Sequence, residues 1–305
     1  MSGENKKSQL KGSKENIRLA PCLLIFAVAA VAGSVIRIVQ TFKFIDSKTG
    51  FYTGGEALAA ILYIIIAVSI LAFCAVSYLS SDNRKITLSG EKHKIAAIGA
   101  LLFALSLLGD CYYSLHAAVL NAGTVGVGYT SAMKSGLIPL LIQSISALFS
   151  AVYLFILASD LSKGSAKAYK RKFLATAPVL WAGSRLIFRF LKQISFVQVS
   201  DLFLELCMIA FMIMFFMALA QTASGVYSDS LRWRIPAFGM SAGLIAAITS
   251  VPRMIVAITA REFVNSDYPF SLNDMIFVVF IITLVIKIKV DADRPGTATA
   301  EEKSE

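Results

Sequence analysis

The sequence predicts an all-α integral membrane protein: a bundle of about eight transmembrane helices with both termini in the cytoplasm. Its 305 residues are 57% hydrophobic and 16% charged, whereas soluble domains average about 45–50% apolar and about 25% charged residues. Apolar runs close to the roughly 20 residues that cross a bilayer recur along the chain. Lysines and arginines gather on alternate connections between these runs, which is typical of a polytopic membrane protein.

Four apolar runs lie in the first half of the chain, at residues 19–40, 57–79, 94–120 and 136–158. Each is long enough to cross the hydrocarbon core as a helix. They lack the alternation of apolar and polar residues that barrel strands show. Because backbone groups in lipid must pair within their own segment, we expect helices.

The first apolar run also resembles a secretory signal peptide, because it follows a basic segment and contains Ala27-Val28-Ala29. It continues through Val39, which is longer than a typical signal-peptide core. We therefore expect this run to stay in the protein as a helix. Cleavage is the open alternative, and it would leave seven helices and an external N-terminus.

Four further runs lie in the second half, at residues 173–192, 200–222, 235–259 and 271–289. The third of these contains Gly239-x-x-x-Gly243, a spacing that favours close packing between membrane helices. The connections are short, so any activity is expected within the helix bundle and its loops.

The basic residues predict the orientation. Twenty of the 29 lysines and arginines lie in the two tails and the even-numbered connections, five lie on the opposite side, and four lie inside helices. The positive-inside rule then places both tails in the cytoplasm, with the lipid bilayer as the partner of the helices. This distribution accounts for the net charge of +10, so nucleic acid is not an expected partner.

The chain is predicted to have one folded unit. Residues 19–290 form a single membrane domain between two polar tails, 1–18 and 291–305, which are predicted to be disordered.

The two halves of this domain show a weak internal similarity, between residues 19–160 and 172–290. Ala32-Gly33-Ser34 recurs as Ala182-Gly183-Ser184, and arginines follow in both halves. Because four crossings return the chain to the same side of the membrane, both units would have the same orientation. This predicts a parallel 4+4 repeat about an axis along the membrane normal. Coincidence among small residues is the alternative.

Intramembrane charges gather in the outer half of the predicted bundle. A charge at the centre of a membrane helix costs roughly 2.5–3.5 kcal/mol even on lenient scales, so each such residue is a candidate for function. The candidate ligand-binding residues are Arg37, Asp110, Arg185, Arg189, Glu205 and Arg253. Supporting residues at similar depth are Glu56, Asp201, Asp274 and Pro252. At a rise of 1.5 Å per residue, all of these residues fall in the outer half of the membrane. They therefore predict a polar cavity that is open to the outside.

Arg185 and Arg189 are expected to pair with the next helix. With Ser195 at the tip of the hairpin, antiparallel neighbours match Arg189 with Asp201 and Arg185 with Glu205. The two arginines are spaced i,i+4, and so are the two carboxylates, so each set occupies one helix face. Mutual neutralisation is one interpretation. The other is that one arginine is shared with a ligand carboxylate or phosphate, which its fork geometry suits.

These features favour a transporter or permease-like protein of a bacterial plasma membrane that binds a small polar or anionic solute from outside. The arginines would supply binding charge, and Asp110 and Glu205 would balance it or carry a coupling proton. A ligand sensor or accessory membrane subunit, an intramembrane enzyme acting on lipid headgroups, and a bundle whose charges simply pair are the alternatives.

Signatures of catalysis and metal binding are scarce. The two histidines do not form His-Glu-x-x-His, the common intramembrane zinc arrangement. We therefore predict no catalytic residue, metal ligand or cofactor and favour a non-enzymatic role, while chemistry based on carboxylates stays open. A second copy of the chain or another membrane protein is a further open partner.

Overall fold

The protein is all-helical in the parts of the chain that the computed structural model describes. These are residues 19–44, 53–80, 92–122, 136–165, 168, 171–191, 199–225, 229–259 and 272–293. The tail 1–18 and residues 294–305 lie outside the described residues, as do the predicted hairpin tip at Ser195 and the loops around it.

Each predicted apolar run corresponds to helical structure. The first half of the chain forms α2 (Leu19–Lys43), α3 (Glu56–Leu79), α4 (Lys94–Ala122) and α6 (Leu137–Lys163). The second half forms α7 (Lys172–Ala175), α8 (Ala177–Leu191), α9 (Val199–Ala223), α10 (Asp229–Thr259) and α11 (Leu272–Asp293). The predicted run 173–192 is therefore two helices, and α11 extends three residues into the segment predicted as a disordered tail.

Six of the described helices are long and apolar enough to cross a membrane: α2, α3, α4, α6, α9 and α10. They indicate a multi-pass membrane protein. By contrast, α8 has 15 residues and α11 carries charges near both ends, so the count of eight crossings stays a prediction.

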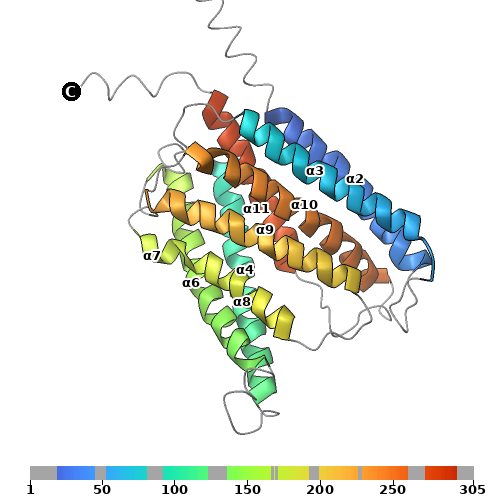
Figure 1. Cartoon of the computed structure of the whole chain (residues 1–305). Coiled ribbons are helices and arrows are strands. Elements are labelled where there is room, and N and C mark those ends of the chain that lie inside the picture. Colours follow the sequence, from blue (N-terminus) through green and yellow to red (C-terminus); the bar gives the residue numbers. More distant parts are fainter. Residues whose placement is uncertain are drawn as a thin grey trace, which may run out of the picture.

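Helix α10 forms the centre of the bundle (Figure 1). It packs against α2 and α3 on one side and against α9 and α11 on the other, while α4, α6 and α8 complete the far side. Helix α2 begins and α11 ends at the same end of the bundle, which we call the termini end, and the opposite end is called the far end (Figure 1).

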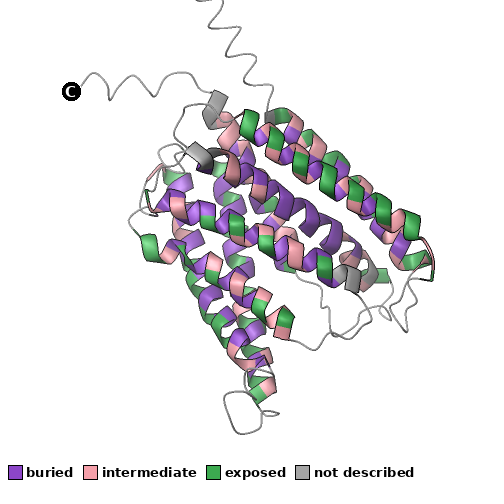
Figure 2. Ribbon diagram, viewed as in Figure 1, coloured by how far each residue is buried: buried purple, intermediate pink, exposed green. Residues whose placement is uncertain are grey.

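Small residues explain the central position of α10. Every residue from 239 to 250 is buried, so this helix is purple along most of its length in Figure 2. Close approach is visible at Gly33 of α2, where an added Cβ would lie 2.6 Å from Ile248 Cδ1. Gly239 and Gly243 likewise face Phe215 and Phe26, as expected of small residues at a helix interface.

Helices α2 and α3 bury one narrow stripe each. In α3 the buried residues are Leu62, Ile66, Ser69, Phe73 and Ser77, a spacing of three and four that defines one helix face. Large apolar side chains cover the outer faces, as with Val35 and Leu71. An exposed apolar surface of this extent fits contact with lipid tails.

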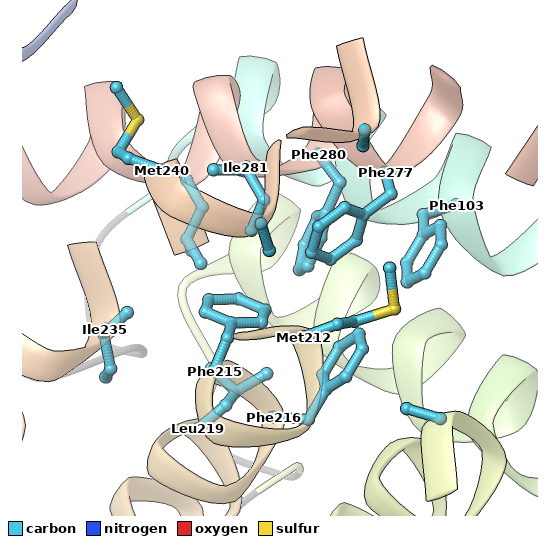
Figure 3. Packing of buried hydrophobic residues seen from close by; sticks show 14 of the residues in the cluster. Phe103, Met212, Phe215, Phe216, Leu219, Ile235, Met240, Phe277, Phe280 and Ile281 are labelled. Atoms are coloured by element: carbon cyan, nitrogen blue, oxygen red, sulfur yellow. The ribbon is translucent and has the colours of Figure 1, made fainter. Parts of the chain in front are cut away.

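An aromatic layer fills the interior between α4, α9 and α11 (Figure 3). Phe103 of α4 stacks on Phe280 of α11 at 5.4 Å and on Phe216 of α9 at 6.1 Å between ring centroids. Phe277 lies 5.5 Å from Phe103, and the edge of Trp181 of α8 completes the layer at 6.0 Å. All five rings are fully buried, so they form a closely packed aromatic part of the core.

The two halves of the chain pack differently. Gly33 is enclosed by Ile248, whereas an added Cβ at Gly183 would meet no described atom within 4 Å. Helix α10 occupies the centre, while α4, its expected counterpart, packs mainly on α6 and α11. The 4+4 repeat therefore stays a prediction.

Candidate functional site

The site is built around the short helix α8. Thr176 separates α7 from α8, and the Val179 backbone N–H donates to its carbonyl. Pro178 lies in the first turn of α8, where a missing N–H costs no helical hydrogen bond. Arg185 and Arg189 then follow one turn apart, and both side chains turn into the bundle with 8% and 14% exposure.

Arg185 forms a bidentate pair with Asp274 in the first turn of α11. Its Nη1 donates to Oδ1 at 2.9 Å and its Nη2 to Oδ2 at 3.3 Å. Two parallel hydrogen bonds between a guanidinium and a carboxylate are the strongest common form of this pair. The sequence placed Asp274 among the supporting residues, and it is the principal partner of Arg185.

Glu205 of α9 is shared by three arginines. Arg189 Nε donates to its Oε1 at 2.8 Å, and Nη2 of the same arginine lies 2.8 Å from that oxygen. Arg185 Nη2 lies 4.0 Å from Oε1, and Arg253 Nη2 of α10 lies 3.9 Å from Oε2. Oε2 is buried and accepts no hydrogen bond from the described residues. These five residues (Arg185, Arg189, Arg253, Glu205 and Asp274) are called the charge cluster below.

The predicted pairing register is seen in part. Arg189 pairs with Glu205, one turn beyond its predicted partner Asp201. The Asp201 side chain lies outside the described residues, so the pair with Arg189 stays a prediction. The predicted Arg185 and Glu205 contact is present but long at 4.0 Å. An arginine side chain spans about one helical turn, so equal distances from a hairpin tip do not determine which carboxylate it reaches.

Asp110 of α4 is connected to the charge cluster through Trp181. Its Oδ2 accepts hydrogen bonds from Trp181 Nε1 at 2.6 Å and from Gln143 Nε2 of α6 at 3.0 Å. On the other side of the indole ring, the Arg185 guanidinium carbon lies 5.2 Å from the ring centroid. This distance is within the range of a cation–π interaction.

The remaining predicted residues are Arg37, Glu56 and Pro252. Arg37 is buried on α2 and donates to Gln40 Oε1 on its own helix at 2.9 Å. Glu56 is exposed at the first residue of α3. Pro252 is buried inside α10, directly before Arg253, where the missing N–H leaves the preceding turn of the helix without one backbone bond.

Trp181, Gln143 and Gln40 were missed by the sequence prediction, which considered formal charges. Trp181 precedes Arg185 by four residues and so shares its helix face. The two glutamines are amides within apolar runs, which is an equally informative signal because a buried amide needs partners.

A serine with catalytic spacing occurs in Gly239-Met240-Ser241-Ala242-Gly243. A nucleophile elbow requires a sharp turn between a strand and a helix. Ser241 instead lies inside α10, is fully buried, and donates to the Ala237 carbonyl at 2.8 Å. This sequence serves helix packing.

The chemistry of the cluster suits anions. Its five side chains carry three guanidinium groups and two carboxylates, and guanidinium groups bind carboxylate or phosphate in a bidentate manner. No group of three His, Cys, Asp or Glu side chains that could hold a metal ion occurs among the residues that the structure describes.

No known protein family, curated protein or solved structure matches this chain.

Proposed function

We propose that this multi-pass membrane protein binds a small anionic solute at the charge cluster and carries it across the membrane. The observation that supports the proposal most is the sharing of Glu205 by three arginines, with Oε2 accepting no hydrogen bond from the described residues. Arg253 faces that oxygen at 3.9 Å, which is beyond hydrogen-bonding distance. Three guanidinium groups gathered at one carboxylate are the part of the described site best suited to hold an anion.

The arginines of the cluster favour an anionic ligand. Asp274 pairs with Arg185 through two hydrogen bonds, and Glu205 lies within 4.0 Å of all three arginines. A carboxylate or phosphate group of a small solute provides both the charge and the paired oxygens that a guanidinium fork recognises.

The proposed orientation follows from the basic residues. With eight crossings and both termini cytoplasmic, the charge cluster lies in the outer half of a bacterial plasma membrane and is reached from outside. The aromatic layer lies on its cytoplasmic side, because Trp181 precedes Arg185 on an outward-running helix and Phe277 follows Asp274 on an inward-running one. In this proposal the parallel 4+4 repeat provides the two halves that move against each other.

The test is uptake in proteoliposomes across a panel of acetate, lactate, benzoate, methanesulfonate, inorganic phosphate and glycerol phosphate. The wild type is expected to accumulate at least one of these anions. Arg253→Gln should abolish that uptake, and Arg171→Gln, which removes an exposed arginine, should preserve it. Equal uptake by the wild type and Arg253→Gln would contradict the proposal.

A ligand sensor is the second candidate, and the aromatic layer is the observation that favours it. Five fully buried rings pack together beside the cluster, and in the proposed orientation a transporter would have to move them to open the cytoplasmic side. Saturable binding that depends on Arg253, in a protein that shows no flux, would favour the sensor over the transporter.

A further inference from the structure

Asp110 differs from the other carboxylates in the type of its hydrogen-bond donors. Glu205 and Asp274 accept from guanidinium groups at 2.8 and 2.9 Å. Asp110 accepts from two neutral N–H groups, those of Trp181 and Gln143, and both converge on Oδ2. Within the described residues its Oδ1 accepts no hydrogen bond, and the side chain is partly accessible. A proton can therefore bind at Oδ1 while both existing hydrogen bonds are kept.

We propose that Asp110 is a proton-binding site coupled to the anion site through Trp181. The inference rests on the proposed function for its coupling, whereas proton binding itself is independent of any anion. Trp181 is the physical link, because its Nε1 donates to Asp110 at 2.6 Å and its ring face lies under the Arg185 guanidinium at 5.2 Å. Hydrogen bonds to a charged acceptor are roughly twice as strong as those to a neutral one. Proton uptake at Asp110 therefore loosens the indole that supports Arg185.

Charge balance gives the direction of the coupling. Asp110 is joined to the charge cluster through Trp181 and Arg185. Entry of a monoanion at the cluster adds a negative charge near Asp110, and a proton on Asp110 offsets it. Because a net charge is costly in a membrane interior, the anion and the proton should bind together. The expected stoichiometry is one proton per monoanion.

Asp110 is the carboxylate best placed to take up this proton. The charged group facing it from α8 is Arg185, behind which lies Asp274 of α11. Helix α6 presents the neutral groups of Gln143 and Ser144. On α4 itself Cys111 is the adjacent titratable residue. Protonation of Glu205 or Asp274 would break direct contacts with arginine, whereas protonation of Asp110 weakens hydrogen bonds from neutral donors.

The test uses the full-length protein with Trp181 as its only tryptophan. Trp233→Phe removes the other indole, which packs against Tyr78 and Phe238 at the termini end of the bundle. In this background Trp181 emission should change in a single step as the pH is varied. Asp110→Asn preserves an acceptor for Trp181 and Gln143 but cannot titrate, so the step should disappear. Asp110→Glu should keep a step with a displaced midpoint, and it serves as the second variant if the asparagine protein fails to fold.

Two results would overturn the proposal: a flat emission profile in the Trp233→Phe protein, or a step that survives Asp110→Asn. Adding Arg253→Gln to the Trp233→Phe background separates the inference from the proposed function. A step retained in that protein, together with lost anion uptake, supports both statements. If the Trp233→Phe protein shows the emission step but the wild type transports none of the panel anions, the proton site is supported and the transport proposal is rejected.

Coupling is measured with methanesulfonate, which stays a monoanion throughout. If one proton binds with each anion, the apparent affinity for methanesulfonate should fall about tenfold per pH unit above the pH of the emission step. Asp110→Asn should abolish this slope while binding persists. A slope that is equal in the wild type and Asp110→Asn would exclude Asp110 as the coupled site.

Discussion

Arg185 and Asp274 join α8 to α11 through two hydrogen bonds of 2.9 and 3.3 Å, with 8% and 6% of their side chains exposed. Breaking a buried ion pair by removing one partner leaves an uncompensated charge and costs about 3–5 kcal/mol. Arg185→Met and Asp274→Leu are each expected to destabilise the bundle by this amount. The double variant should cost much less than the sum, as measured by denaturation in mixed micelles.

A second double-mutant cycle, on Arg185 and Glu205, is the control for assigning Asp274 as the principal partner of Arg185. These side chains approach to 4.0 Å, so their coupling should be smaller than that of Arg185 and Asp274. Additivity within about 0.5 kcal/mol for Arg185 and Asp274 would contradict their role as principal partners.

Two glycines in identical tripeptides should respond in opposite ways to alanine. A Cβ at Gly33 would lie 2.6 Å from Ile248 Cδ1, whereas a Cβ at Gly183 would meet no described atom within 4 Å. Gly33→Ala should destabilise the protein by about 1–3 kcal/mol through overpacking. Gly183→Ala should be neutral or stabilising by about 0.4–1 kcal/mol, because alanine restricts the unfolded chain.

Thermal unfolding of both variants in detergent tests this contrast. Ile248→Val removes the atom nearest to the added methyl group and should lower the cost of Gly33→Ala. Equal effects at the two glycines would instead favour equivalent positions, as the 4+4 repeat predicts.

The sequence predicted the helices well and the pairing within the site less well. Apolar length depends on local composition, so each predicted run corresponds to helical structure. The predicted ends differ from the observed ones by up to six residues, and the run 173–192 is two helices. The partner of Arg185 depended on the position of α11, which lies 89 residues away in sequence. No local sequence pattern predicts a contact between residues so far apart in the chain.

Asp110 illustrates the same limit in another way. Its depth placed it near the arginines, but its contacts are the neutral side chains of Trp181 and Gln143. A prediction based on charged residues does not identify these neutral side chains. Arg37 is buried and donates to Gln40 on the same helix, and its place in the site stays a prediction.

The indole N–H of Trp181 should contribute to stability separately from its ring. Trp181→Phe keeps an aromatic side chain beside Phe103 and Phe216 but removes one of the two donors to Asp110. A net loss of about 1.5–3 kcal/mol is expected for a hydrogen bond to a charged group. Trp233→Phe is the matched control and should change the unfolding free energy by less. Equal losses in the two variants would mean that the hydrogen bond to Asp110 contributes little.

Cysteine accessibility tests whether α8 crosses the membrane. Residues Ser165 and Gly225 flank the segment that contains α8 and α9, and α9 is long enough to cross. If α8 crosses as well, cysteines at these two positions should react with an impermeant thiol reagent from the same side of sealed vesicles. A cysteine at Thr53 should react from the opposite side. Labelling of positions 165 and 225 from opposite sides would reduce the number of crossings to fewer than eight.

The most direct test of the central proposal is anion binding to the purified protein, followed as a rise in the unfolding temperature. At least one anion of the panel used for uptake should stabilise the wild type in a saturable manner. Arg253→Gln should lose this response, and Arg171→Gln should retain it. A wild type that no panel anion stabilises, or an Arg253→Gln protein that responds like the wild type, would contradict an anion site at Glu205.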